Sequence, residues 1–179
     1  MKLLSKFMTL AAAVAVSVSL ASCGGDDNEE PDIPSKPVVE SVTAAYSAKL
    51  SDAYFEFYDV TVIYTDEDGK RVTRTVNSGG EFNSIIPAAK LPEKIQFAVQ
   101  INAKNPTPSI DKSAKYIFED DISLAVRVKY SDGTTGQYND QGAPGTMTIG
   151  GDNLAAYLAK YQEELFGPFE YSTASLTNK

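Results

Sequence analysis

The side chains available for chemistry in this sequence are carboxylates, tyrosines and lysines, because it contains no histidine and a single cysteine. A Ser-His-Asp or Cys-His nucleophile needs a histidine as its base, so both systems are excluded. Histidine-ligated zinc and haem sites, and the two-histidine, one-carboxylate iron site, are excluded for the same reason. Carboxylate catalysis, tyrosine or lysine chemistry and oxygen-ligand binding of Ca²⁺ or Mg²⁺ stay open.

One acidic cluster precedes a glycine in a turn pattern. Asp66, Glu67 and Asp68 lie directly before Gly69, and Asp66 and Asp68 are the candidate metal ligands. An EF-hand loop needs acids at alternate positions, then a glycine and a distant glutamate, and this spacing departs from that pattern. A solvated hairpin turn is therefore the favoured interpretation.

A second acidic cluster, Glu119-Asp120-Asp121, precedes a clear strand pattern. The acid and nucleophile of a glycosidase lie ~5–9 Å apart and come from different strands. Adjacent acids on one strand point to opposite faces, so this cluster favours a charged beginning of a strand over catalysis.

Aromatic and basic residues supply two further candidate surfaces. The sequence has ten tyrosines and no tryptophan, and the candidate ligand face consists of Tyr54, Tyr58, Tyr64 and Tyr130. Burial in or near the core is the favoured alternative for these rings. A small basic patch is also a candidate, with cross-strand pairing to acids as the commoner outcome. Its members are Lys70, Arg71, Arg74, Arg127 and Lys129.

Alternating apolar and polar residues predict a mainly β, antiparallel fold. Asp-Gly pairs at residues 68–69 and 132–133 predict tight hairpin turns. Loops are expected over residues 77–92 and 139–151. The spacing is typical of a β-sandwich-like domain of about 6–8 strands. Strands are expected over residues 38–50, 54–65, 71–76, 95–103, 122–130 and 134–138, with shorter ones at 146–149 and 169–176.

One amphipathic helix is expected near the C-terminus, at about residues 153–166. Asp152 is a suitable N-cap, and Gly167-Pro168 is a suitable stop. We expect the apolar stripe to pack on the sheet or to close one end of the sandwich, and partner binding is the alternative. The stripe consists of Leu154, Tyr157, Leu158, Tyr161 and Leu165.

The N-terminal segment has the pattern of a processed leader. Lys2 and Lys6 precede an apolar run from Phe7 to Leu20, which is shorter than the ~20 apolar residues that span a bilayer. The run ends in Leu20-Ala21-Ser22-Cys23, which resembles the lipobox of bacterial lipoproteins. That resemblance implies cleavage before Cys23, a diacylglyceryl thioether on its sulfur and an acyl chain on its amino group. Several acyl chains, at ~0.8 kcal/mol per buried CH₂, make a stable anchor.

The residues after Cys23 resemble the surface-export signal of Bacteroidetes-type lipoproteins. Gly24 stands where the usual inner-membrane retention signal has Asp. The resemblance implies an outer-membrane lipoprotein that faces the cell exterior, with the periplasmic face as the alternative. Residues 23–37 are acidic and rich in proline, which predicts an extended tether, and residues 38–179 then form a single domain. The acids of the export signal are Asp26, Asp27, Glu29 and Glu30.

The net charge of the chain disfavours some classes of partner. Removal of residues 1–22 leaves 157 residues with 14 basic and 24 acidic side chains, a net charge of −10. Such a chain is a poor partner for nucleic acid or anionic lipid. With its thiol acylated, Cys23 is also no longer a metal ligand, and the covalent lipid is the only expected prosthetic group.

We therefore expect a non-catalytic binding or interaction module, either accessory to an envelope complex or adhesin-like, with an envelope protein or a glycan as partner. A structural assembly subunit that exchanges strands is one alternative. A carboxylate-dependent, glycan-acting enzyme is another. Two acids facing each other in a tyrosine-lined cleft, one with a raised pKa, would favour the enzyme.

Overall fold

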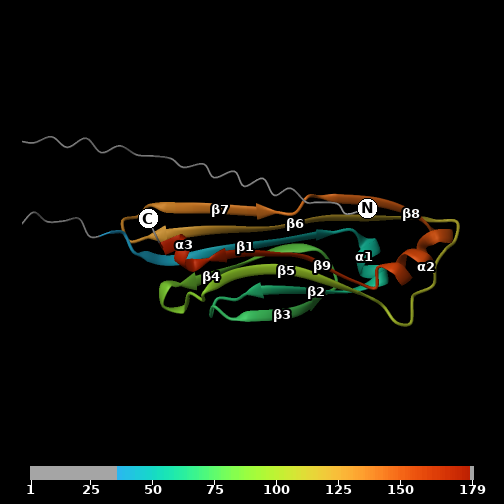
Figure 1. Cartoon of the computed structure of the whole chain (residues 1–179), viewed down its shortest axis with the longest axis horizontal. Coiled ribbons are helices and arrows are strands. Elements are labelled where there is room, and N and C mark those ends of the chain that lie inside the picture. The colour runs from blue at the N-terminus through green and yellow to red at the C-terminus, as the bar shows by residue number, and fades with distance from the viewer. Residues whose placement is uncertain (1–35, 178–179) are drawn as a thin grey trace, which may run out of the picture. The chain divides into compact units, whose positions relative to one another are not determined.

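The computed structural model describes residues 36–177, which form two antiparallel sheets packed as a sandwich (Figure 1). Sheet A has the order β4-β1-β6-β7, with β8 also paired to β6, and sheet B has the order β3-β2-β5-β9. The strands of sheet A are β1 (Val39–Leu50), β4 (Gly80–Pro87), β6 (Lys115–Tyr130), β7 (Thr135–Gln141) and β8 (Gly145–Gly150). Those of sheet B are β2 (Tyr58–Thr65), β3 (Arg71–Val76), β5 (Lys94–Ala103) and β9 (Glu163–Ser172). The predicted mainly β, sandwich-like class is confirmed.

Short helices lie at both ends of the sandwich. Figure 1 shows α1 (Asp52–Phe57) and α2 (Gly151–Lys160) together at one end and α3 (Thr173–Thr177) at the other. A 3-10 turn, η1 (Ala88–Lys90), connects β4 to β5. Leu154 and Leu158 of α2 are buried, so the helix packs internally and closes its end of the core.

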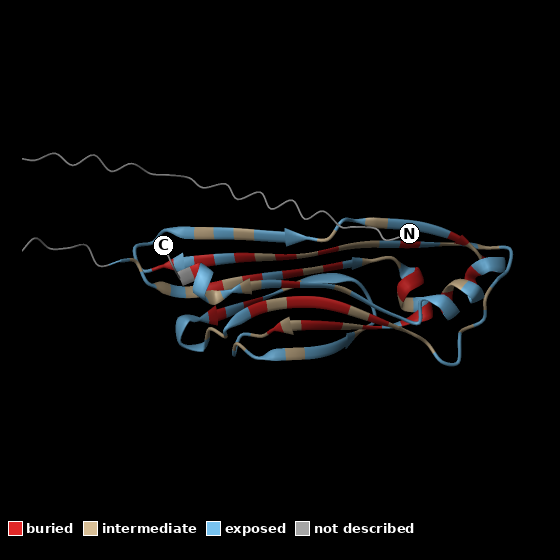
Figure 2. Cartoon of the chain, viewed as in Figure 1, coloured by how far each residue is buried: buried red, intermediate tan, exposed pale blue. Residues whose placement is uncertain are grey.

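The core follows from alternation along the strands. On β6 every second residue from Ile122 to Tyr130 is buried, and on β1 the buried positions run from Val42 to Ala48 in the same way. Because side chains on a strand alternate between its two faces, both rows point between the sheets. Figure 2 shows this burial concentrated on the inner strands, whereas β3 and β7 are largely exposed. Ile63, on the outer face of β2, is also buried, as expected for a strand between two neighbours.

The predicted helix at residues 153–166 is wrong in its second half. Helix α2 ends at Lys160, and β9 begins at Glu163. Tyr161 and Leu165 matched the helical spacing, but residues 163–172 pair with the free edge of β5. Gly150 rather than Asp152 is the N-cap. Gly167, with φ +93°, does not end a helix but lies in a bulge of β9.

Three other predictions required correction. Residues 54–57 belong to α1 rather than to a strand, because Tyr54 and Phe57 are buried from one side of a helical turn. The predicted loop 77–92 contains β4, which pairs with β1. Strand β6 begins at Lys115, earlier than predicted, because β8 extends its ladder. The described residues therefore hold nine strands, one more than the expected range.

Both predicted hairpin turns are confirmed. Gly69 and Gly133 have φ values of +73° and +81°, in the region that favours glycine.

Candidate functional site

An open basin of about 900 Å³ lies where β1, β4, β6 and β8 meet. Its lining contains one basic residue, Lys49, and five acidic ones. We call this surface the acidic basin. Its acids are Asp52, Glu81, Glu119, Asp120 and Asp121.

The register of sheet A sets the charge of the acidic basin. Glu119 and Asp121 alternate with inward-facing residues of β6, so their side chains lie on the outer face of the sheet. Lys49 is opposite Asp121 across the β1–β6 ladder, and its Nζ lies 3.0 Å from Oε1 of Glu81. Among the described residues, no other acid of the basin has an ion-pair partner. The acidic basin therefore carries a net negative charge.

Ser51 fixes the junction between α1 and β6 at this site. Its Oγ donates to the carbonyl oxygen of Ile117 at 2.7 Å and accepts from the amide of Glu119 at 3.0 Å. These bonds hold Asp52, the first residue of α1, beside the acids of β6.

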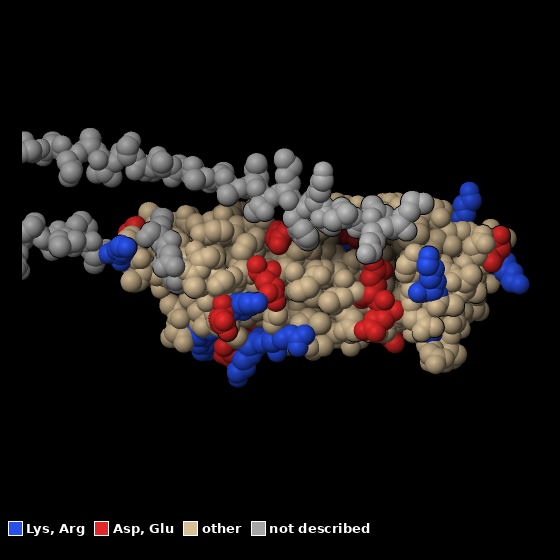
Figure 3. Space-filling view, viewed as in Figure 1, with Lys and Arg blue, Asp and Glu red and all other residues tan. Residues whose placement is uncertain are grey.

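A second acidic feature, which shares Asp120 with the acidic basin, lies near the end that carries α1 and α2. Asp120 alternates with the buried residues Phe118 and Ile122, so its carboxyl faces inward and is half-buried. Glu164 is opposite Ile101 in the β5–β9 ladder and is therefore on the strand face that turns toward sheet A, but it is exposed because β9 is the edge strand of sheet B. We call these two residues the inter-sheet acid pair. Figure 3 shows acidic side chains in a column near this end of the domain.

Aromatic rings surround the inter-sheet acid pair. The hydroxyl of Tyr54 donates to Oδ2 of Asp120 at 3.3 Å. The ring of Tyr54 meets that of Phe118 edge to face, with centroids 5.1 Å apart, and Phe118 lies 5.6 Å from the ring of Tyr157. Burial raises the pKa of both Tyr54 and Tyr157, so their hydroxyls stay protonated donors.

Both carboxyls of the pair are poor acids in the folded chain. Burial raises the pKa of Asp120, although hydrogen bonds from Tyr54 and from the amide of Gly145 act against it. Partial burial also raises the pKa of Glu164, and the negative charge of Asp120 adds to the effect. The negative charge of Asp120 therefore acts on Glu164 through space.

The candidate tyrosine ligand face does not form. Tyr54, Tyr58 and Tyr130 are buried and Tyr64 is half-buried. The hydroxyl of Tyr130 donates to the carbonyl oxygen of Leu176 at 2.9 Å, far from Tyr54 at the α1 end. Core packing, the favoured alternative, describes these rings.

The Asp66–Asp68 turn is held by its own hydrogen bonds. Oδ1 of Asp66 accepts from the amides of Asp68 and Lys70 at 2.9 and 2.8 Å, and Asp68 forms an ion pair with Lys90 at 2.5 Å. Within residues 36–177, no group of three or more acids, histidines or cysteines is placed to hold a metal ion. The carboxylates of Asp66 and Asp68 thus have structural partners.

The residues of the predicted basic patch do not lie together on one sheet. In the predicted basic patch, Arg71 and Arg74 are on sheet B, whereas Lys129 is on sheet A and pairs with Glu40 at 2.7 Å. The lipidation residue Cys23 and the export acids Asp26, Asp27, Glu29 and Glu30 lie outside the described residues.

Sequence reasoning missed Glu164, which it placed on a helix, and Glu81, which it placed in a loop. Residues 163–166 read Glu-Glu-Leu-Phe, which does not alternate between polar and apolar side chains, so the strand signal was weak. No pattern in the sequence links either residue to Asp120.

Comparisons of the chain with protein-family models, curated proteins and solved structures found no match. No helix in the described part of the chain is long and apolar enough to cross a membrane.

The inter-sheet acid pair should make the protein less stable as the pH rises. Its carboxyls hold protons more tightly in the folded chain than in the unfolded chain, where the pKa of a carboxyl is about 4. By linkage, the free energy of unfolding then falls as the pH rises from about 4 through the raised values. Asp120→Asn, which keeps an acceptor for Tyr54, should be more stable than the wild type near neutral pH and match it in acid. Urea unfolding across the acidic range measures this difference.

Asp68→Asn is the control of opposite sign. Lys90 lowers the pKa of Asp68 through a hydrogen bond and its charge, so this contribution to stability is present at neutral pH and lost in acid. The variant should be less stable than the wild type at neutral pH, with the difference vanishing as the pH falls. If both variants changed stability in the same direction, the claim that the inter-sheet acid pair destabilises the folded protein at neutral pH would be wrong.

Proposed function

We propose that the chain is a lipid-anchored, surface-displayed binding module without catalytic activity, which holds basic groups of a partner in its acidic basin. The observation that carries this proposal is the acidic basin itself. It has a volume of about 900 Å³ and is lined by five acids and one lysine, and that lysine already pairs with Glu81. A concave surface of one sign raises the local concentration of oppositely charged partners and speeds their association. An accessory role in an envelope complex or an adhesin-like role fits such a surface.

The proposed placement rests on the lipobox at Cys23 and the acidic segment that follows it. Protease treatment of intact cells should remove the wild-type domain and spare a variant whose Asp26, Asp27, Glu29 and Glu30 are replaced by neutral residues. A Cys23→Ala variant should leave the membrane fraction altogether. Equal digestion of the wild type and the neutral variant would place the domain by some other signal, and full protection of both would favour the periplasmic face.

Partner binding is tested by crosslinking in living cells followed by pull-down of the tagged protein. Glu119→Lys reverses a charge in the acidic basin at an exposed position, and Glu67→Lys makes the same change in the β2–β3 turn as a matched control. We expect Glu119→Lys to reduce recovery of the crosslinked partner at least tenfold, while Glu67→Lys recovers it fully. Equal recovery by both variants would exclude the basin. Recovery of the protein only with itself would favour the alternative of a strand-exchanging assembly subunit.

A carboxylate-dependent enzyme is the second candidate, because Asp120 and Glu164 come from different sheets and both have a raised pKa. Such a pair can divide the roles of proton donor and anion. If it acts on glycans, Asp120→Asn and Glu164→Gln should each abolish hydrolysis, whereas Glu119→Gln should retain it. Release of reducing sugar from a panel of surface and host polysaccharides measures this. Activity that survives in both variants would remove the pair from consideration.

A further inference from the structure

A small hollow lies on the outer face of sheet B, on the opposite sheet from the acidic basin. Its volume is about 230 Å³. Ile63 and Ala98, which are paired across the β2–β5 ladder, form an apolar floor, and each is less than one-tenth exposed although it faces away from the core. Leu165 and Pro168 of β9 form one wall. We call this feature the sheet B pocket.

The bulge in β9 creates the sheet B pocket. Phe169 is opposite Phe97, and Phe166 is opposite Val99, so Gly167 and Pro168 together stand opposite Ala98 alone. A bulge of this kind bends its strand and interrupts the ladder. The methyl group of Ala98 leaves the opened space unfilled. A side chain at Gly167 would come within 3.1 Å of the carbonyl oxygen of Phe97 and would need a positive φ, so this bend depends on glycine.

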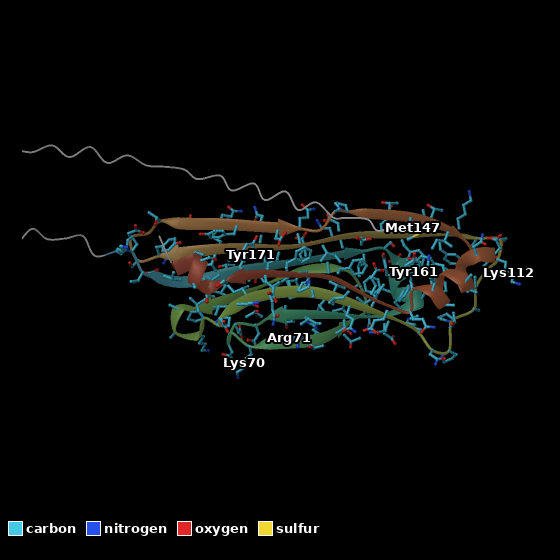
Figure 4. The ribbon with its side chains drawn as sticks, in the orientation of Figure 1. Lys70, Arg71, Lys112, Met147, Tyr161 and Tyr171 are labelled. Carbon is cyan, nitrogen blue, oxygen red and sulfur yellow. The ribbon has the colours of Figure 1, made fainter. Side chains whose placement is uncertain are left out.

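The charge at the sheet B pocket comes from Arg71. Glu170, on the opposite rim, is compensated by Lys94, whose Nζ lies 2.9 Å from its carboxylate. Arg71 forms no ion pair with any of the residues 36–177. Figure 4 labels Lys70 and Arg71 next to each other at the beginning of β3, and Figure 3 shows basic side chains in that region together with acidic ones. Although the chain has a net charge of −8, the lining of the sheet B pocket thus presents one guanidinium that has no ion pair with residues 36–177.

We propose that the sheet B pocket binds a small aliphatic carboxylate, with its apolar part on Ile63 and Ala98 and its carboxylate held by Arg71. A guanidinium presents two parallel N–H donors that match a carboxylate. A cavity of about 150 Å³ can hold benzene, so a hollow of about 230 Å³ has room for a branched chain of a few carbons or for the terminal residue of a peptide. The side-chain amide of Gln96, on the rim, offers a further polar contact.

The two sources of such a group are a free short-chain acid and the C-terminus of a peptide, and the experiment separates them. The ¹⁵N-labelled full chain is titrated with isovalerate and with an acetylated dipeptide that ends in leucine, each beside its amide. We expect saturable shifts of the amides of Gln96, Ala98 and Leu165 with the carboxylates, at least tenfold weaker with the matching amides. Tighter binding of isovalerate points to a free acid, and tighter binding of the dipeptide points to a peptide terminus.

Arg74 supplies the matched control for Arg71. It is on the same strand but pairs with the inward-facing Val62, so it lies on the other face of sheet B. Arg71→Gln should weaken carboxylate binding at least tenfold, and Arg74→Gln should leave it unchanged. Ala98→Leu, which fills the floor, should abolish binding while keeping the spectrum of a folded domain. If Ala98→Leu fails to fold, the two arginine variants still decide the outcome.

The absence of saturable shifts, equal binding of isovalerate and isovaleramide, or equal effects of the two arginine variants would overturn the proposal. It does not depend on the function proposed for the acidic basin, because Glu119→Lys acts on the opposite sheet and should leave this titration unchanged.

Discussion

Replacing Tyr46 by alanine is expected to lower the free energy of unfolding by about 3–5 kcal/mol, the usual range for removing a large aromatic ring from a core. Tyr46 is 1% exposed on β1 of sheet A. Its ring lies 5.2 Å from that of Phe97 and 5.0 Å from that of Phe82, and its hydroxyl donates to the carbonyl oxygen of Thr65 at 2.5 Å. Burial raises the pKa of this hydroxyl. One side chain therefore joins the two sheets through both packing and a buried hydrogen bond, and chemical denaturation of the purified protein measures its loss.

Two phenylalanine variants separate the ring of Tyr46 from its hydroxyl. Tyr46→Phe keeps the packing but leaves a buried carbonyl without its donor, which costs about 1–3 kcal/mol. Tyr64 contacts the same ring, with centroids 5.5 Å apart, and is half-buried. No hydrogen bond of the Tyr64 hydroxyl joins it to the described residues, so Tyr64→Phe should change stability by less than about 0.5 kcal/mol. Equal losses of stability in the two variants would mean that the hydrogen bond between Tyr46 and Thr65 contributes no more than the Tyr64 hydroxyl does.

The parts of this fold that sequence predicts best are those whose signal is local. Asp68-Gly69 and Asp132-Gly133 can form their turns wherever they occur, because the required positive φ is a property of glycine. The alternation from Ile122 to Tyr130 likewise predicts a half-buried strand from its own period. Both features are confirmed because their local sequence favours one conformation without help from tertiary contacts.

The parts that were predicted wrongly are those that tertiary contacts decide. Tyr161 and Leu165 fit a helical period, but the free edge of β5 pairs with residues 163–172 and selects the strand. Residues 54–57 have strand-like composition, but Ser51 ties the chain to β6 and turns it into α1. Residues 80–87 have weak alternation, and β1 supplies their pairing.

The candidate sites depend on the same long-range pairings. The acidic cluster at residues 119–121 was visible in the sequence, but its division between two faces followed only from the position of β6 inside sheet A. The charge of Asp120 acts on Glu164 because β9 completes sheet B. Arg71 belongs to a pocket because a bulge more than ninety residues away along the chain opens opposite Ala98.

Gly151→Ala is expected to lower the free energy of unfolding by about 2–3 kcal/mol, as over-packing of a buried position does. Gly151 is the buried first residue of α2, and an added Cβ would lie 2.0 Å from the carbonyl oxygen of Asp111. Because that obstacle is backbone, α2 must shift, and Tyr157 with it, so the aromatic wall of the inter-sheet acid pair should loosen too. Gly80→Ala is the control, since its Cβ meets nothing within 4 Å and a less flexible unfolded chain favours it by about 0.4–1 kcal/mol. Denaturant unfolding should place the two variants on opposite sides of the wild type; if Gly151→Ala were as stable as Gly80→Ala, the close approach of residues 111–114 to α2 would not exist in solution.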